Sequence, residues 1–254
     1  MPSNDSRKVG LARALSKLGY CSRSRASELI RDGHVSLNGV TRHDPETRTR
    51  LGRDSIAVDG SEIRSPRNFY LMMNKPRGLV TTASDDKGRK TIYSLLPLDE
   101  SLPWLAPVGR LDKASEGLLL LTNDSEWGAR ITAPETHLSK AYHVQINSIA
   151  IDNVLRAMQR GVMSEGEILR ATRCRLLRSG EKNCWLEITL DEGKNRHIRR
   201  MLAAFGLDVL RLVRVSIGPL RLGTLTKGHF RFLTSQEKAE LDGAIRSFRS
   251  RAIH

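Results

Sequence analysis

The segment of this 254-residue chain with the clearest capacity for chemistry is a charged loop that runs directly into an apolar strand. It spans residues 109–124, GRLDKASEGLLLLTND. A continuous apolar run of this kind is typical of a strand buried on both faces. Asp112 is therefore expected at the mouth of a rigid element, where polar neighbours can hold a carboxylate in fixed geometry. The alternative is that Asp112 only caps a turn, which is the commoner role of an isolated aspartate.

Glu116 lies four residues beyond Asp112, and a pair of carboxylates about 5–9.5 Å apart is what a glycosidase requires. The charge of the chain argues against that activity. It carries 42 Lys and Arg against 28 Asp and Glu, a formal net charge of +14 that suits a polyanion better than a neutral sugar. RNA, DNA and an anionic membrane all fit this charge, and the lack of a long basic amphipathic helix disfavours the membrane.

A second concentration of functional side chains covers residues 192–200, EGKNRHIRR, at an expected junction of strand and helix. Its cations are Lys194, Arg196, Arg199 and Arg200. Arg196 and Arg200 are one helical turn apart, and Arg199 faces a neighbouring side. The planar guanidinium group can donate two hydrogen bonds to a phosphate, although a charge run can also be a solvated face. His197 is expected to be a polar packing residue rather than a ligand.

An alternating strand begins at Lys140-Ala141-Tyr142, so Lys140 and Tyr142 point to the same side. A cation and an aromatic ring on one face can hold a phosphate and stack a nucleobase. The ring can equally be an ordinary, partly buried strand residue. Arg173 and Arg175 share one face of another strand, which lies either near the polyanion or at a solvent-facing edge protected by charge.

A small αα-ββ unit is expected ahead of these segments, over residues 9–64, after a flexible tail at residues 1–8. Its first helix has Leu11, Leu15 and Leu18 at helical spacing, and its second runs from an N-cap at Ser22 to Arg31. Strands follow at residues 34–39 and 55–60, the first closed by an Asn38-Gly39 turn. Five cations on the two helices predict contacts with an RNA backbone: Arg13, Lys17, Arg23, Arg25 and Arg31.

Residues 65–68 are the expected linker, and residues 69–254 the larger domain. Its expected strands are residues 69–74, 117–123, 140–146, 173–178, 184–190 and 229–234, and its helices are residues 151–161 and 196–206. The chain is therefore predicted to be an α+β protein. A small αα-ββ RNA-binding module precedes a mixed α/β domain with a mainly antiparallel sheet.

Composition and spacing narrow the class further. No apolar run approaches the ~18–20 residues of a membrane span, and the first residues contain no apolar signal segment, so we expect a cytoplasmic protein without a membrane partner. The three cysteines form no CxxC pair and the seven histidines no HExxH pattern, which argues against a disulfide framework and a metal site. A monomer is the default expectation.

These motifs together resemble the ribosomal-RNA pseudouridine synthases of the branch that carries an N-terminal RNA-binding domain like that of ribosomal protein S-four. Residues 15–39 resemble that N-terminal module. NKPRGLVTT and GRKTIYSLLP resemble the opening motif of the family, and GRLDKASEGLLLLTND its catalytic loop. KAYHVQI and EGKNRHIRRM complete the set in the expected order.

The resemblance implies that Asp112 is the catalytic aspartate, that Tyr142 stacks on the target base and that Arg199 pairs with the aspartate. Arg110, Lys140, Lys194, Arg196 and Arg200 are then further RNA-contacting residues. The implied activity converts a uridine of ribosomal RNA to pseudouridine, on the RNA itself or on an immature ribosomal subunit, without metal or redox cofactor. The C-terminal stretch, residues 218–234, favours large-subunit RNA as the target.

The resemblance leaves two chemical routes open, because Asp112 either attacks the ribose or removes a ribose proton. Two departures from the family pattern are visible. His197 stands where Gln is more usual, and Ser24-Arg25 where Arg-Glu is. The first leaves the chemistry intact, and the second bears on RNA docking.

Two other function classes also fit the sequence. A non-catalytic RNA-binding ribosome-assembly protein on the same scaffold explains the charge equally well. The joint presence of Asp112, Tyr142 and Arg199 distinguishes the enzyme, because a pure binder has no chemical reason to hold them together. A DNA-binding role is the third choice, since no helix-turn-helix with a clear recognition helix is apparent.

Overall fold

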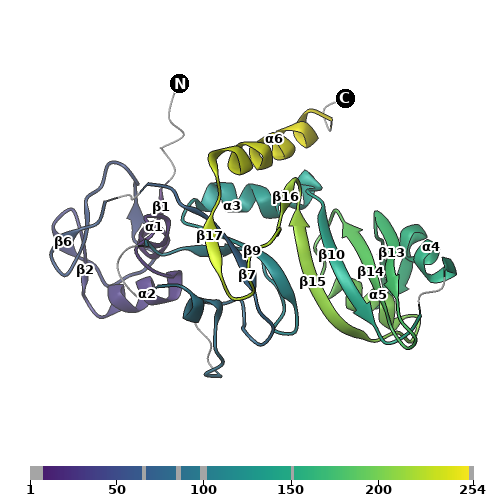
Figure 1. Cartoon of the computed structure of the whole chain (residues 1–254). Coiled ribbons are helices and arrows are strands. Elements are labelled where there is room, and N and C mark those ends of the chain that lie inside the picture. Colours follow the sequence, from purple (N-terminus) through teal and green to yellow (C-terminus); the bar gives the residue numbers. More distant parts are fainter. Residues whose placement is uncertain (1–7, 65–66, 84–86, 98–101, 150–151, 252–254) are drawn as a thin grey trace. The chain divides into compact units, whose positions relative to one another are not determined.

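The computed structural model of the protein describes residues 8–64, 67–83, 87–97, 102–149 and 152–251 (Figure 1). They form two compact units. The N-terminal unit contains the chain up to Tyr70 together with residues 97–106 and 122–125, and the second unit contains the rest. Most of the expected tail, residues 1–7, and residues 65–66 of the expected linker lie outside the described residues.

Two short helices, a four-stranded antiparallel sheet and a two-stranded ribbon build the N-terminal unit. The helices are α1 (Leu11–Lys17) and α2 (Arg23–Arg31). The sheet has the order β3-β2-β5-β6, and the ribbon pairs β1 with β4. The strands are β1 (Val9–Gly10), β2 (Val35–Leu37), β3 (Val40–Thr41), β4 (Arg48–Thr49), β5 (Ile56–Val58) and β6 (Ser61–Glu62). The predicted αα-ββ arrangement is confirmed.

Local sequence signals set the ends of these elements. The Ser22 hydroxyl accepts a hydrogen bond from the Arg25 N–H (3.2 Å) and caps α2, as its position predicts. Gly33 follows α2 with a φ of 82°, a left-handed conformation that glycine adopts at least cost. Asn38 and Gly39 have φ values of 53° and 78° and form the predicted turn. The helices and strands can then share one apolar core.

Two later segments of the chain complete the N-terminal unit. The Trp104 N–H donates to the Gly19 carbonyl (2.7 Å). The side chain of Asn123 accepts from the Phe69 N–H (2.7 Å) and donates to the Arg67 carbonyl (3.0 Å). These bonds join residues that are far apart in sequence, so the division of the structure does not follow a single cut in the chain.

A nine-stranded sheet is the frame of the second unit. Its order is β13-β14-β10-β15-β9-β7-β17, with β16 paired to β15 and β8 to β9. The strands are β7 (Tyr70–Lys75), β8 (Ala106–Val108), β9 (Glu116–Thr122), β10 (Lys140–Ile146), β13 (Arg173–Ser179), β14 (Cys184–Leu190), β15 (Val209–Ile217), β16 (Leu220–Arg221) and β17 (Phe230–Phe232). The pairing is mainly antiparallel, as predicted, while β9 runs parallel to β15.

Helices pack on one face of β10, β13, β14 and β15 (Figure 1). They are α4 (Asp152–Arg160) and α5 (His197–Ala203). Together with the hairpin of β11 (Val162–Ser164) and β12 (Glu167–Leu169) they enclose a core that contains Val144, Leu186 and Met201. Strand β9 is buried along its whole length, which confirms the interpretation of its apolar run.

Smaller elements complete the second unit. Helix α3 (Ser125–Thr132) is joined to α6 (Ser235–Arg251) by a hydrogen bond from Trp127 Nε1 to Asp242 Oδ1 (2.9 Å). Two short 3-10 helices span Ile92–Leu95 and Pro134–Thr136. No helix of the described chain is long and apolar enough to cross a membrane.

The sequence patterns do not predict β15, α3 or α6. In β15 the arginines of VLRLVRVSI interrupt the apolar alternation, and α6 is rich in polar residues. The helix expected at residues 196–206 is shorter. It begins at His197, because Arg196 adopts a left-handed φ of 47°, and it ends at Ala203.

Candidate active site

One cleft of the second unit brings the three principal candidates together. It has a volume of about 620 Å³ and is lined by the 108–112 segment, by residues of β10 and β15, and by residues 190–199. Asp112, Tyr142 and Arg199 all line it. Binding sites for small molecules usually measure about 300–1,000 Å³, so the cleft can accommodate a ligand of nucleotide size.

Asp112 stands on a turn whose backbone is held at every residue. All carbonyls from Leu111 to Ser115 accept hydrogen bonds. The donors are Thr81 Oγ1 to Leu111 (2.8 Å), Lys75 Nζ to Asp112 (3.2 Å) and to Ser115 (2.9 Å), the Gly78 N–H to Lys113 (2.8 Å), and Arg199 Nη2 to Ala114 (3.4 Å). The Ser115 N–H closes the turn onto the Asp112 carbonyl (2.9 Å). The exposed Asp112 side chain therefore projects from a fixed backbone.

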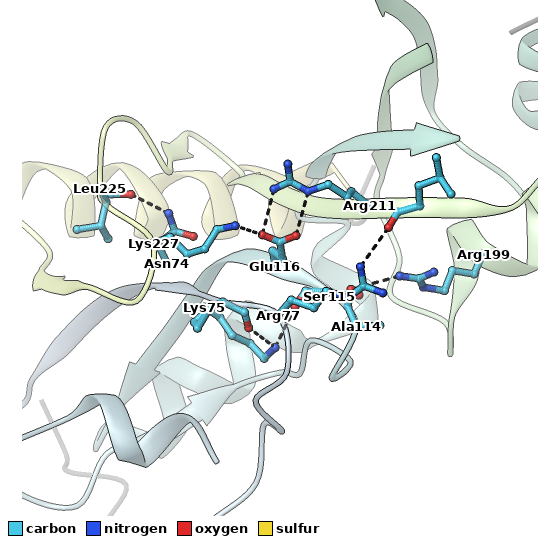
Figure 2. Close-up of polar contacts among 12 residues, drawn as sticks. Asn74, Lys75, Arg77, Ala114, Ser115, Glu116, Arg199, Arg211, Leu225 and Lys227 are labelled. Atoms are coloured by element: carbon cyan, nitrogen blue, oxygen red, sulfur yellow. Dashed lines mark hydrogen bonds and ion pairs between the residues drawn. The ribbon is translucent and has the colours of Figure 1, made fainter. Parts of the chain in front are cut away.

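Several of these contacts come from the NKPRG segment, residues 74–78, and Figure 2 shows some of them. Besides the Lys75 and Gly78 bonds, Asn74 Nδ2 donates to the Leu225 carbonyl (2.7 Å) and Arg77 Nη1 to the Leu210 carbonyl (3.5 Å). Gly78 has a φ of 99°, which glycine permits. The sequence alone identifies this segment as a motif without a role. In the structure it supports the turn of Asp112.

Lys75 is completely buried, and its Nζ donates to the carbonyls of Pro76 (3.1 Å), Asp112 and Ser115. Burial lowers the pKa of Lys75 to about 8, although the carboxylates of Asp112 and Glu116 act to raise it. At neutral pH the ammonium form still predominates. This form has three N–H donors, one for each carbonyl.

The Arg199 side chain binds a backbone carbonyl of the turn that carries Asp112. Its Nη2 donates to the Ala114 carbonyl, and its Nη1 to the Val209 carbonyl in β15 (3.2 Å). Burial lowers the pKa of Arg199, the charge of Arg196 lowers it further, and the Asp112 carboxylate raises it. In the described chain no ion pair joins the two side chains, so the implied pairing of Arg199 with Asp112 stays a prediction.

Tyr142 and Lys140 both line the cleft from the same side of β10. The ring of Tyr142 is half-buried against the core, with part of its surface exposed. Burial lowers the pKa of Lys140, the nearby Arg214 lowers it further, and Asp191 raises it. Arg214 lies opposite Tyr142 on the neighbouring strand β15.

Arg214 is a cleft residue that the sequence analysis missed. It is 6% exposed, its Nε donates to the Leu118 carbonyl (2.7 Å), and its Nη2 is buried without a hydrogen-bond partner. With Lys140 and Arg199 it makes the cleft cationic, which suits an anionic ligand. The signal that could have identified it is an arginine between apolar residues in VLRLVRVSI, residues 209–217.

The predicted RNA-contacting residues occupy several places. Arg110, Lys140, Lys194 and Arg196 line the cleft. Arg200 does not line it, because its guanidinium forms ion pairs with Glu165 (3.2 Å) and Glu167 (3.1 Å) and donates to the Ser164 carbonyl (2.8 Å). In the N-terminal unit, Arg13, Arg23, Arg25 and Arg31 are exposed and Lys17 is half-buried on α1 and α2. Arg25 is paired with Glu28 (3.1 Å).

Two further candidates from the sequence, His197 and Glu116, are buried. His197 is 3% exposed, and burial lowers its pKa despite the opposing effect of Glu192, which fits the expected packing residue. Glu116 is buried and paired with Arg211 and Lys227, and it does not line the cleft beside Asp112. Among the described residues, no three His, Cys, Asp or Glu side chains form a group that could hold a metal ion.

Comparison with known families defines the class of protein that this fold and cleft belong to. Residues 69–204 match the family model of RNA pseudouridylate synthase, and residues 9–54 match the S4 domain. The first match covers more than half of the chain. The protein therefore belongs to the RNA pseudouridylate synthase family and carries an N-terminal S4 domain, as its motifs predicted.

Individual relatives agree over almost the full length. The chain is 36% identical over 240 residues to an uncharacterised RNA pseudouridine synthase of Aquifex aeolicus, covering 94% of this chain and 95% of that protein. It is 33% identical over 234 residues to the ribosomal large subunit pseudouridine synthase B of Bacillus subtilis, covering 91% and 94%. A crystal structure of a pseudouridylate synthase shares 30% identity and a TM-score of 0.62, covering 92% of this chain and 99% of that one. The protein is thus a pseudouridine synthase, an isomerase.

Proposed function

We propose that this pseudouridine synthase isomerises a uridine of ribosomal RNA and that Asp112 is its catalytic aspartate. The observation that carries the proposal is the convergence of Asp112, Tyr142 and Arg199 on one cationic cleft. They come from three separate segments of the chain. A protein that only bound RNA would have no chemical use for a carboxylate held on a fixed turn among cations.

In the proposed reaction, the bond between N1 of uracil and C1′ of the ribose breaks, and a bond between C5 and C1′ forms. C5 loses its hydrogen as a proton and N1 gains a proton, so substrate and product are isomers. The Asp112 carboxylate takes part either by attacking the ribose or by removing a ribose proton. In both routes the turn keeps the carboxylate in place while the detached base rotates.

Tyr142 is proposed to stack on the target base after the base leaves the RNA helix. Extrusion of a base costs a few kcal/mol, and stacking on an aromatic side chain contributes about 1–3 kcal/mol. Phosphate contacts from Arg110, Lys140 and Arg214 would offset the remainder. The walls of the cleft would exclude water and retain the detached uracil, so that it rejoins the ribose.

Large-subunit RNA is the proposed target, because the Bacillus subtilis relative at 33% identity is named for the large ribosomal subunit. The cations of α1 and α2 would dock the RNA through its backbone. We further propose a division into an RNA-binding domain at residues 9–64 and a catalytic domain at residues 69–254. The acting form would be a cytoplasmic monomer that works on the RNA itself or on an immature ribosomal subunit.

Release of tritium from ribosomal RNA labelled at C5 of uridine tests the proposal, since forming the new bond expels that hydrogen. We expect release by the wild type and none by Asp112→Asn, with RNA binding unchanged. Asp208→Asn is the matched control, because Asp208 is an exposed aspartate outside the cleft. Equal turnover by Asp112→Asn would remove Asp112 from the catalytic role.

The same assay with different RNA substrates tests which ribosomal RNA is the target and whether the protein is an enzyme at all. Release from small-subunit RNA alone would correct the proposed target. Binding without release, from both RNA and immature particles of either subunit, would favour the non-catalytic assembly protein.

A further inference from the structure

Glu116 is a buried carboxylate at the first position of β9, directly after the turn that carries Asp112, and it is 3% exposed. Arg211 donates to both of its oxygens, from Nε to Oε1 (3.2 Å) and from Nη2 to Oε2 (3.2 Å). Lys227 forms an ion pair with Oε2 (Figure 2). Burial alone would raise the pKa of Glu116, but the bonds from Arg211 and Lys227 lower it below its ordinary value. The group is therefore ionised at neutral pH.

Each cation around Glu116 is itself positioned by another element. The loop that carries Lys227 is fixed to β7, because Asn74 Nδ2 donates to the Leu225 carbonyl (2.7 Å) and the Gly228 N–H donates to the Asn74 carbonyl (2.8 Å). The Arg211 guanidinium lies 5.5 Å from the centre of the Trp185 ring of β14. Glu116 thus adds a side-chain link between β9, β15 and the loop that β7 holds, beside the pairing of these strands in the sheet.

The pairing between β9 and β15 spans few residues, so the ion pairs of Glu116 matter more for holding the two strands together. Only two residue pairs define the parallel register, Val213 with Glu116 and Arg214 with Gly117. The strands approach so closely there that a Cβ atom on Gly117 would lie 2.3 Å from the Arg214 carbonyl oxygen. A buried ion pair adds little net stability compared with apolar packing, but it can specify one arrangement over others.

We propose that Glu116 is a positioning residue for the reaction at Asp112. Its carboxylate fixes the start of β9, four residues after Asp112, through Arg211 and Lys227. Its negative charge also acts on Lys75, whose ammonium group binds the Asp112 and Ser115 carbonyls. This inference rests on the proposed function, because that function assigns the chemistry to Asp112.

The effect on Lys75 separates this role from a merely structural one. The carboxylates that act on the Lys75 ammonium are those of Asp112 and Glu116, and the cations that face Glu116 are Arg211 and Lys227. Without the charge of Glu116, the pKa of Lys75 should fall below its value of about 8. The neutral amine has only two N–H donors for three carbonyls, so the turn should loosen at a lower pH than in the wild type.

Glu116→Gln in the full chain tests the proposal, because the substitution keeps the shape of the side chain and removes its charge. We expect kcat of tritium release to fall by about tenfold to a hundredfold, since small displacements of a reacting group have effects of this size. The KM for RNA should be unchanged, and the alkaline limb of the pH profile should move to lower pH. Glu187→Gln is the matched control. Glu187 is bonded to Arg175 (2.7 Å), and β10 and β15 separate its strand from β9.

Three outcomes would overturn the proposal: wild-type kcat in folded Glu116→Gln, a lower kcat with an unmoved alkaline limb, or an equal fall in Glu187→Gln. If Glu116→Gln does not fold, Lys227→Gln takes its place, because the Lys227 side chain is 51% exposed. It should lower kcat severalfold at constant KM, and an unchanged kcat would overturn the proposal. Failure of the proposed function is recognised separately, since wild type and Glu187→Gln would then release no tritium either.

Discussion

Replacing Lys75 by methionine should slow the reaction about a hundredfold and destabilise the protein only moderately. Methionine is apolar and of similar length, so the main change is the loss of the three bonds from Nζ. The Asp112 carbonyl keeps the Ser115 N–H, while the Pro76 and Ser115 carbonyls lose the ammonium donor. A buried acceptor left without its donor costs about 1–3 kcal/mol, so the buried Ser115 carbonyl and the part-buried Pro76 carbonyl together cost at most about 6 kcal/mol.

Removal of the buried charge offsets part of this loss. The pKa of Lys75 falls from 10.5 to about 8, mainly through burial. At about 1.4 kcal/mol per pKa unit, burial of the ammonium costs about 3 kcal/mol, and methionine avoids that cost. The free energy of unfolding should therefore decrease by no more than about 3 kcal/mol. The freed turn lets Asp112 move, and a misplacement of about 1 Å can lower the rate about a hundredfold.

The assay is kcat for tritium release at saturating RNA, measured together with denaturant unfolding. Wild-type activity should fall as the pH rises through about 8, because Lys75 then becomes a neutral amine with two donors for three carbonyls. The residual activity of Lys75→Met should lack this fall. Lys182→Met, in the exposed turn between β13 and β14, is the control. A folded Lys75→Met protein with kcat within about threefold of wild type would refute the reasoning.

The remaining predictions concern the arginines. Arg199→Lys keeps the charge but cannot reach both the Ala114 and Val209 carbonyls, so kcat should fall at least about tenfold with RNA affinity unchanged, as measured by tritium release and filter binding. Equal loss of affinity would instead indicate that Arg199 binds RNA. Arg23→Gln combined with Arg31→Gln should weaken RNA binding and reduce its logarithmic salt slope by about 0.7–0.9 for each phosphate that the variant no longer neutralises, with kcat at saturation unchanged. An unaltered salt slope would argue against docking by α2.

The sequence predicts those features of the site that depend on the type and spacing of nearby residues. The apolar run after Asp112 requires a buried strand, and β9 is buried along its whole length. The alternation in KAYHVQI places Lys140 and Tyr142 on one side of β10, and both line the cleft. The Ser22 cap and the Asn38-Gly39 turn follow from local hydrogen bonding and backbone conformation in the same way.

The contacts that hold the turn are not visible in the sequence, because they join side chains to backbone carbonyls. Lys75 binds a carbonyl 40 residues away, and Arg199 binds one 85 residues away. Neither acceptor depends on the identity of its residue, so no complementary side chain marks it. Arg211 was missed for a related reason. Its partner Glu116 is 95 residues away. In addition, Arg211 and Arg214 interrupt the apolar pattern of β15, so the sequence does not reveal the strand that carries these two arginines.

The way the turn is held explains how the backbone that carries an exposed carboxylate can be precisely placed. A side chain on an ordinary surface loop can move with the loop, and catalytic groups are best supported by rigid elements. Here all carbonyls of the turn, from Leu111 to Ser115, are bonded, and this gives the turn its rigidity. The donors lie on β7, on the segment that follows β7, on α5 and, for one bond, within the turn at the Ser115 N–H. Any shift of the Asp112 backbone must break at least one of these bonds. The cost of ordering the turn is therefore met on folding, before RNA binds, and the reaction does not bear it again.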